Sequence, residues 1–331
     1  MVQRAGQGDK YAELATLLGC YAMGEGTQPT AIPALQLFRA TRTDIVHHEI
    51  YEPSLCLVAQ GSKIALLGDE TLTYAPGHFL LVSISMPLTT RISEASPTRP
   101  YLALKIALDP SLITDVLAKT PGVAALVPGV RRGLSAGVAD PLLRDAATRL
   151  VRLLDTPQHI PVLAPLILRE LAYLLLVGDD GAVWRATMLA TGPMQRIARI
   201  IGRLRREFDR PLRVDALAAE AAMSVSSLHA HFKAATAMSP LQYLKQVRLQ
   251  EARDLLLREH LDAAEAGSRV GYDSPSQFSR DYRRLFGAPP GRDVARLRAG
   301  GDAAGSAPES GAARNANGGR DVGRRHRGGP R

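Results

Sequence analysis

Short apolar segments separated by turn signals fill most of residues 34–106. Pairs that favour turns lie between these segments, among them Gln60-Gly61 and Pro76-Gly77. Many short strands at a spacing of about ten residues are typical of an antiparallel barrel or sandwich. We therefore predict a barrel in this half of the chain. The expected strands cover residues 34–40, 45–51, 55–60, 63–67, 71–74, 79–83 and 102–106.

The hydrophobic spacing becomes helical after Asp109. The helix expected over residues 163–177 is apolar almost all round, so it should be buried inside the fold or in a dimer interface. Arg169 and Glu170 at its centre make membrane insertion unfavourable, and no membrane partner is expected. With an early helix before the strands, the predicted helices cover residues 10–20, 110–119, 141–154 and 163–177.

Two stretches near the C-terminus, residues 223–240 and 272–290, repeat each other about fifty positions apart. A short alanine-rich helix is expected before each copy, and each carries small residues at similar places. These are Ala218 and Ala222 in the first copy and Gly267 and Gly271 in the second. A short helix, a turn and a second helix form a helix-turn-helix unit, and two such units can contact two adjacent major grooves. The matched positions are Ser224 and Ser274, Leu228 and Phe278, Phe232 and Tyr282, Lys233 and Arg283, and Pro240 and Pro290.

Four helices in and between these copies begin at residues that can cap them. At Ser239 and Ser274 a proline follows, and a glutamine stands at the third helical position, as in a capping box. Gly271 and Gly287 lie where helices should end. The expected capping residues are Ser224, Ser239, Asp262 and Ser274.

The second helix of each copy has an apolar face and a polar face. The apolar positions, predicted to be buried, are Leu228, Phe232 and Ala235 in the first copy and Phe278, Tyr282 and Leu285 in the second. Arginine can bind guanine through two hydrogen bonds, and serine or histidine can reach base edges or phosphates. One polar face alone could be a solvated surface, but two matched faces favour DNA contact. The predicted DNA-binding residues are Ser226, Ser227, His229, Ala230, Lys233, Ser276, Ser279, Arg280 and Arg283.

Residues 240–258 join the two copies and predict a single helix, because they contain no proline or glycine after Pro240. A helix of this length spans about 27 Å at 1.5 Å per residue. Elements that enter successive major grooves lie about 34 Å apart. A stiff rod with a reading helix at each end would meet that requirement, with binding on one DNA face and some bending.

Residues 195–298 resemble the DNA-binding domain of the AraC/XylS family of transcription regulators. The resemblance includes the run VGYDSPSQFSRDYRRLFG and the double proline after it. It implies seven helices with two helix-turn-helix units, double-stranded promoter DNA as a partner and recruitment of RNA polymerase. The chain departs from the family at Ala222, where glycine is common, and at Ala230, where many relatives carry a basic residue.

Charge is distributed unevenly along the 331 residues. Residues 1–194 carry 16 Lys and Arg against 17 Asp and Glu, whereas residues 195–298 carry 19 against 12. A near-neutral body joined to a basic segment is typical of a DNA-binding module with a separate partner domain. Residues 299–331, rich in glycine, alanine and arginine, are expected to form a disordered basic tail.

Cysteine content excludes several classes of protein. Cys20 and Cys56 alone are too few for a disulfide framework or a structural zinc site. The same count argues against the DNA-repair methyltransferases that share this kind of DNA-binding domain, because they need a cluster of zinc-binding cysteines. Polar residues such as Glu13 interrupt the N-terminal segment, so no secretory leader is expected and the cytoplasm is the expected compartment.

The N-terminal half, residues 10–190, is similar to the cupin-like N-terminal domain of one subgroup of AraC-type regulators. The segments that carry this resemblance are YEPSLCLVAQGSK (51–63), YAPGHFLLVS (74–83) and LAPLILRELAYLLLVG (163–178). The resemblance implies a β-barrel with a helical cap that senses a small molecule, and helices that pair two subunits. The whole chain is then an α+β multidomain protein with an all-α C-terminal domain.

Metal-dependent cupins use two or three histidines and a carboxylate in one cavity. His47 and His48 are adjacent, and neighbouring residues on a strand point to opposite faces. His78 and His159 are isolated, so we expect no metal, no cofactor and no catalytic residues. Cys56 is interpreted as a small buried hydrophobic residue. The other hypothesis, with Cys56 as the candidate ligand-binding residue, is a thiol inside the barrel that reacts with an electrophile or oxidant and switches the regulator.

These observations predict a DNA-binding transcription regulator, in first place an activator, with a small-molecule effector in the barrel and possible homodimerisation. Two alternatives remain open. One is a cupin-type enzyme with an incidental basic domain. The other is a ligand-independent DNA-binding protein whose barrel only dimerises.

Overall fold

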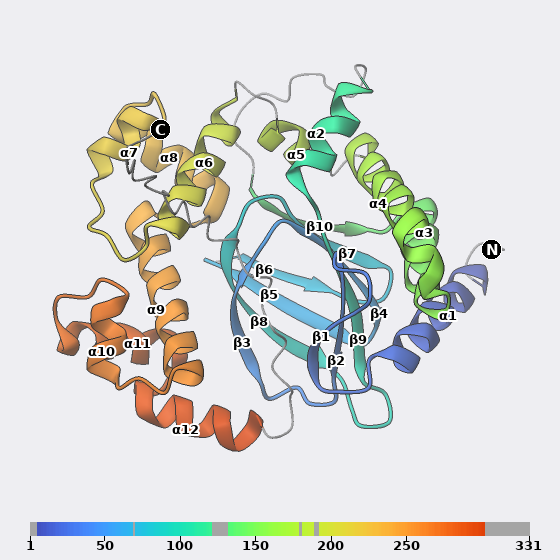
Figure 1. Cartoon of the computed structure of the whole chain (residues 1–331), viewed down its shortest axis with the longest axis horizontal. Coiled ribbons are helices and arrows are strands. Elements are labelled where there is room, and N and C mark those ends of the chain that lie inside the picture. The colour runs from blue at the N-terminus through green and yellow to red at the C-terminus, as the bar shows by residue number, and fades with distance from the viewer. Residues whose placement is uncertain (1–4, 69, 121–131, 179–180, 189–191, 302–331) are drawn as a thin grey trace, which may run out of the picture.

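The computed structural model describes residues 5–68, 70–120, 132–178, 181–188 and 192–301. A β-rich N-terminal part and a helical C-terminal part lie side by side (Figure 1). This is the multidomain α+β arrangement that the sequence predicts. The expectation for the basic tail from residue 302 onward lies outside the described residues.

The strands form two antiparallel sheets, with the orders β1-β2-β9-β4-β7-β10 and β3-β8-β5-β6. All seven predicted strands are confirmed, each to within one residue at either end. The strands are β1 (Gly26–Pro29), β2 (Leu35–Ala40), β3 (Val46–Tyr51), β4 (Ser54–Gln60), β5 (Ser62–Leu67), β6 (Glu70–Tyr74), β7 (His78–Val82), β8 (Met86–Glu94), β9 (Tyr101–Ala107) and β10 (Leu134–Val138).

Three strands, β1, β8 and β10, were not predicted. In β8 the buried positions alternate as in other strands, but Pro87 and the polar Thr90 interrupt the apolar pattern. Proline is tolerated because β8 pairs at Pro87 only with β3, while pairing with β5 begins at Thr89. β1 and β10 are short and contain mostly small or polar residues, so they carry little hydrophobic signal.

The first sheet is covered on both faces. On β4, Leu55 and Leu57 point into a core shared with the N-terminal helices. Cys56, between them, points the other way, into a core shared with the second sheet. This confirms that Cys56 faces opposite to its neighbours. The space between the two sheets is the interior of the cupin-like barrel.

Helices α1, α3 and α4 lie along the outer face of the first sheet, on the right in Figure 1, and α2 and α5 lie near the top of the view. Each predicted helix is confirmed, and α5 was not predicted. Their bounds are α1 (Ala5–Tyr21), α2 (Pro110–Ala118), α3 (Pro141–Arg152), α4 (Ile160–Val177) and α5 (Gly181–Met188), with short 3-10 turns at Leu153–Asp155 and Pro157–His159.

Helix α4 is half buried rather than fully enclosed. Its inner side contributes Ile167 and Leu171 to the core, while Val162 and Leu166 are 66% and 59% exposed. The segment Pro157–Val177 is long and apolar enough to cross a membrane by length and composition. Its charged residues bind neighbouring helices instead: Arg169 pairs with Asp115 of α2, and Glu170 pairs with Arg149 of α3 at 2.7 Å.

Seven helices follow in the described C-terminal part, the number that the family resemblance implies. They are α6 (Pro193–Arg206), α7 (Val214–Glu220), α8 (Val225–Thr236), α9 (Pro240–Arg258), α10 (Ala263–Arg269), α11 (Pro275–Phe286) and α12 (Pro290–Gly301). Helix α9 runs from the cluster formed by α6, α7 and α8 to the cluster formed by α10, α11 and α12 (Figure 1).

The second sheet packs against this helical part. Helix α9 contacts β3 and β8, and the Tyr243 hydroxyl on α9 donates a hydrogen bond to the Ser85 carbonyl at 2.9 Å. Arg205 on α6 forms an ion pair with Glu52 at the end of β3. One hydrophobic cluster includes buried residues from the barrel interior and from α6, α8 and α9. The barrel and the first half of the helical part therefore share a continuous core.

Candidate nucleic-acid interface

We call α7 with α8 the first reader, and α10 with α11 the second reader. The predicted caps begin the helices as expected. The Ser224 side chain accepts a hydrogen bond from the Ser227 amide, and Ser274 accepts one from the Gln277 amide. The remaining two are Asp262 before α10 and Ser239 before α9, the latter with a complete capping box. Local sequence alone thus determines where all four of these helices begin.

The turn inside each reader passes through a left-handed backbone conformation. Its residue is Ala222 in the first reader, with φ of 48°, and Gly271 in the second, with φ of 84°. An arginine from the preceding long helix binds each turn. Arg196 of α6 donates to the carbonyls of residues 221 and 222, and Arg248 of α9 donates to the Gly271 carbonyl at 2.8 Å. Sequence analysis did not identify these two arginines.

Both α8 and α11 bury one face almost completely. Leu228, Phe232 and Ala235 are inaccessible to solvent, as are Phe278 and Tyr282. The third buried position of α11 is Phe286 and not the predicted Leu285, which is only half-buried. The correction follows from the helical period of 3.6, since a fourth-residue step from Tyr282 reaches Phe286.

All predicted DNA-binding residues lie on the opposite faces, accessible to solvent. In α8 the exposed residues are Ser226, His229, Ala230 and Lys233, with Ser227 partly covered beside His231. In α11 they are Ser276, Arg280 and Arg283, with Ser279 partly covered. The structure thus brings these residues together on two matched faces.

Helix α9 has the predicted bounds, Pro240–Arg258, and at 1.5 Å per residue its 19 residues extend for about 28 Å. Its first turn follows α8 directly, and its later turns contact α10, α11 and α12. A single continuous helix therefore connects the two readers, so they cannot move independently without bending it.

The second reader contains a buried ion pair that joins its helices. Asp293 of α12 is fully buried, and its carboxylate accepts hydrogen bonds from Arg253 of α9 at 2.8 Å and from the Tyr282 hydroxyl at 2.9 Å. Burial and the neighbouring Asp293 carboxylate raise the pKa of the Tyr282 phenol well above its usual value. This network ties α9, α11 and α12 into one unit.

A residue of the barrel half binds the end of the first reading helix. Arg132, in the segment before β10, donates to the carbonyls of Lys233 and Ala234 at 2.9 and 2.8 Å. Glu70 of β6 holds the same guanidinium in an ion pair. The Gly133 amide donates to the Ala235 carbonyl at 2.8 Å. A cation at a helix C-terminus satisfies free carbonyls and the helix dipole, so this contact stabilises the docked first reader.

The second reader touches the barrel through an aromatic contact. His48 of β3 lies edge-on to Phe286 of α11, with the ring centroids 5.3 Å apart. Burial, and then the nearby Arg253 guanidinium, lower the pKa of His48 from 6.5 to about 4. His47 points the other way and lies edge-on to Phe38 in the barrel, at 5.9 Å. The expectation that the two histidines face opposite sides of the strand is confirmed.

The described residues contain no group of three or more His, Cys, Asp or Glu side chains that could hold a metal ion. Cys56 is buried in the barrel, and burial raises the pKa of its thiol despite the opposing effect of Lys105. A raised pKa keeps the thiol protonated, and the thiolate is the reactive form. The geometry thus agrees with the interpretation of Cys56 as a small buried residue.

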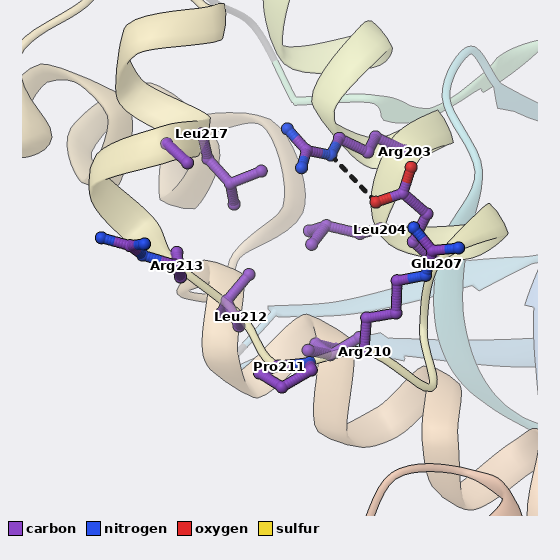
Figure 2. Close-up of a pocket in the computed structure, with 10 residues that line it drawn as sticks. Arg203, Leu204, Glu207, Arg210, Pro211, Leu212, Arg213 and Leu217 are labelled. Atoms are coloured by element: carbon purple, nitrogen blue, oxygen red, sulfur yellow. Dashed lines mark hydrogen bonds and ion pairs between the residues drawn. The ribbon is translucent and has the colours of Figure 1, made fainter.

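Figure 2 shows a pocket of about 120 Å³ in the helical part, where the end of α6 meets the start of α7. Three arginines line it, but Arg203 pairs with Glu207 at 3.3 Å and also with Glu220 of α7. The positive charge of Arg203 is thus already balanced by two carboxylates of the helical part. We interpret this pocket as part of the framework that holds α6 against α7.

A larger hollow of about 340 Å³ separates the barrel from the junction of α8 and α9. Leu66 and Pro87 line it from the second sheet, and Met238 and Gln242 line it from the helical part. It lies beside Gly68, where an added Cβ would approach the Ala237 Cβ to 3.0 Å. The interface between barrel and first reader is therefore tight at one point and open beside it.

Parts of the chain match models of known protein families. Residues 31–183 match the model of the AraC-type transcriptional regulator N-terminus, and residues 217–296 match that of a helix-turn-helix domain. A probable thc operon regulatory protein of Rhodococcus erythropolis is 31% identical over 269 residues, which cover 77% of this chain and 79% of the relative. The regulator ExsA of Pseudomonas aeruginosa is 25% identical over 232 residues, covering 68% of this chain and 79% of ExsA.

Other matches are shorter or show the fold alone. The chain spans 31% of the length of the regulator CdhR of Pseudomonas aeruginosa and 55% of the activator VirF of Yersinia enterocolitica. A crystal structure of ToxT from Vibrio cholerae with bound unsaturated fatty acid has a TM-score of 0.51 at 10% identity, covering 78% of this chain and 94% of ToxT. The arrangement of barrel and readers is thus one that occurs in a solved structure.

Proposed function

Because this chain belongs to the AraC/XylS family of DNA-binding transcription regulators, we propose that it activates transcription from specific promoters in response to a small molecule. Residues 10–190 would form the sensor and 195–298 the DNA-binding domain. The observation that carries the proposal is the pair of matched exposed faces on α8 and α11, held at the two ends of α9.

Each face would enter one major groove of double-stranded promoter DNA. Arg280, Arg283 and Lys233 supply positive charge for phosphates or guanines, because arginine can bind guanine through two hydrogen bonds. The hydroxyl groups of the serines and the ring of the histidine would contact base edges or phosphates. The residues proposed for these contacts are Ser226, Ser227, His229, Ser276 and Ser279. Ala230 contributes a methyl group and no hydrogen bond.

The Arg132 contact is the route by which the sensor would act on the first reader. The arginine joins β6, through Glu70, to the last turn of α8. A ligand that shifts the second sheet would move or release this arginine, and with it the first reading helix. The orientation of one reader relative to the other then changes DNA affinity and the recruitment of RNA polymerase.

The exposed side of α4 is the proposed homodimer surface. Large apolar side chains are exposed along it over four turns, namely Val162, Leu163, Leu166, Tyr173 and Val177. Such a stripe on a helix is typical of a protein–protein contact. A soluble regulator of this kind acts on chromosomal DNA, so the cytoplasm is the proposed compartment.

The test measures DNA binding by the full chain. Genome-wide mapping of bound DNA gives a target site, and fluorescence anisotropy then gives the affinity for that site and for a scrambled duplex. We expect Arg280→Ala to weaken binding to the target by roughly tenfold or more, a loss of about 1–3 kcal/mol. Arg99→Ala, which removes an exposed arginine from the loop before β9, is the matched control and should change little.

Two results would contradict the proposal. One is equal affinity for target and scrambled DNA at every salt concentration. The other is an Arg280→Ala variant that binds as tightly as the Arg99→Ala variant. If the protein binds its target but a promoter fusion is active without any added effector, the ligand-independent alternative is favoured, in which the barrel only dimerises.

A further inference from the structure

A lysine is buried inside the barrel. Lys63 of β5 is 5% exposed, and its Nζ donates a hydrogen bond to the Tyr51 hydroxyl at 2.9 Å. The same Nζ lies 4.7 Å from the centroid of the Phe38 ring. An ammonium group carries three N–H donors, so one hydroxyl and an aromatic face satisfy it only in part. Burial of such a charge is unfavourable unless a partner of opposite charge joins it.

A second ammonium group approaches from the opposite sheet. The Nζ of Lys105, on β9, lies 5.2 Å from the centroid of the Tyr51 ring, and the Nζ of Lys63 lies 5.7 Å from the same centroid. Both lysines line one cavity. Two like charges near one ring repel each other, and the protein interior screens this repulsion less than water does.

Within the described part of the chain, neither lysine has a carboxylate at ion-pairing distance. The carboxylate that lines the cavity is Glu49, whose side chain is 45% exposed and pairs with His47 at 3.8 Å. The other nearby side chains are neutral: Tyr51, Tyr74, Tyr101 and the Cys56 thiol. The cavity is therefore lined by two lysines and by one carboxylate that is half-exposed, which leaves a net positive charge at its wall.

The cavity is small and has aromatic walls. Its volume is about 40 Å³. A single water needs about 10–15 Å³, so the cavity has room for about three waters. That space suits a carboxylate of a few carbons. Inorganic phosphate would bring more charge and no apolar group for the rings of Phe38 and the three tyrosines.

We propose that the barrel cavity binds a small organic carboxylate, with its head group between Lys63 and Lys105 and beside the Tyr51 hydroxyl. Its apolar body lies against the aromatic rings. This inference rests on the proposed function, because it names the chemical class of the effector. The carboxylate replaces the missing counter-charge and draws the two sheets together through lysines that belong to each.

The experiment uses the full-length protein with butanoate, its uncharged isostere butanamide, and inorganic phosphate. Thermal unfolding and calorimetric titration report binding, since a ligand that binds the folded state raises the Tm with concentration. We expect butanoate to raise the Tm in a saturable manner, and butanamide and phosphate to leave it unchanged. Lys63→Met and Lys105→Met should each weaken butanoate binding by about tenfold or more.

Two further variants test the role of charge in the cavity. Glu49→Gln removes a negative charge that would repel butanoate, so this variant should bind butanoate more tightly. If Glu49 instead balances the charge of the lysines, the same variant should unfold more easily and gain no affinity for butanoate. Lys119→Met, at the exposed end of α2, is the matched control and should bind butanoate as the wild type does. Lys105→Met keeps the test decisive if Lys63→Met does not fold, because Lys105 is only partly buried.

Equal responses to butanoate and butanamide would overturn the inference, and so would lysine variants that bind butanoate like the control. Binding of phosphate alone would overturn the carboxylate class. The same preparations are assayed for target DNA. Intact DNA binding without butanoate binding rejects this inference alone, while butanoate binding without sequence-specific DNA binding rejects the proposed function alone.

Discussion

At the scale of single residues, the two readers form the same left-handed turn with different amino acids. Ala222 has φ of 48° and Gly271 has φ of 84°, both in the left-handed region. That region places the Cβ of an L-residue close to a backbone oxygen, at a cost of roughly 1–2 kcal/mol. Glycine avoids this strain but loses more entropy on folding. The first reader therefore contains a small strain that the second lacks.

We predict that Ala222→Gly raises the free energy of unfolding by up to about 1 kcal/mol, because relief of strain exceeds the entropy term. Urea unfolding followed by far-UV circular dichroism measures the change. Ala221→Gly is the control: Ala221 has an ordinary right-handed φ of −75°, so glycine there should lower stability by about 1 kcal/mol. If both variants lose stability alike, the strain at Ala222 is not real.

At the scale of elements, each reader packs its short helix on its reading helix with a different pair of residues. A Cβ added at Gly267 would lie 2.9 Å from Cγ of Phe278, so the large ring requires glycine opposite it. The matched residues of the first reader are Ala218 and Leu228, both buried. A larger residue on the short helix thus accompanies a smaller one on the reading helix, and total volume is conserved.

We predict that Gly267→Ala lowers the free energy of unfolding by about 1–3 kcal/mol, the usual cost of overpacking. Phe278→Leu should recover part of this loss in the double variant, because it recreates the pair found in the first reader. A double-mutant cycle in urea measures the coupling between the two sites. Additive losses would show that ring and Cβ do not compete for the same space.

At the scale of the whole molecule, the barrel contacts both readers at the C-terminal ends of their reading helices. Arg132 holds the end of α8, and His48 lies against Phe286 at the end of α11. These contacts, with α9 packed on β3 and β8, make the position of the readers depend on the second sheet. A regulator needs such a dependence if a ligand in the barrel is to change DNA binding.

The His48 contact makes this docking sensitive to acid. Burial lowers the pKa of His48 from 6.5 to about 4. Between pH 6.5 and pH 4, His48 is therefore protonated in the unfolded chain but neutral in the folded protein. Stability from this group is therefore complete above about pH 6.5 and falls as pH falls towards 4. The loss is up to about 2 kcal/mol after allowance for partial solvent access.

We predict that His48→Gln flattens this part of the stability profile. The measurement compares the free energies of unfolding of wild type and variant from pH 7.5 to pH 4.5. The difference between the two proteins should shift in favour of the variant as pH falls, because glutamine takes up no proton. Profiles that run parallel across this range would exclude a role for His48 in the acid response.

Sequence by itself determined the readers, the helix between them and seven of the ten strands that the structure describes. Caps such as Ser224 and Ser274, and the fifty-residue repeat, are signals between residues close along the chain, so they survive without knowledge of the fold. The β8 strand was missed because Pro87 and Thr90 weaken its local pattern, although its pairing with β3 and β5 accommodates both.

Only the tertiary structure decided which distant residues meet. Lys63 and Lys105 are ordinary lysines in the sequence, and become a pair because two sheets place them around Tyr51. Arg132 has no local signal either, since its partners lie on β6 and at the end of α8. Such contacts depend on how sheets and helices pack over long chain separations, and periodicity along the chain carries no record of that packing.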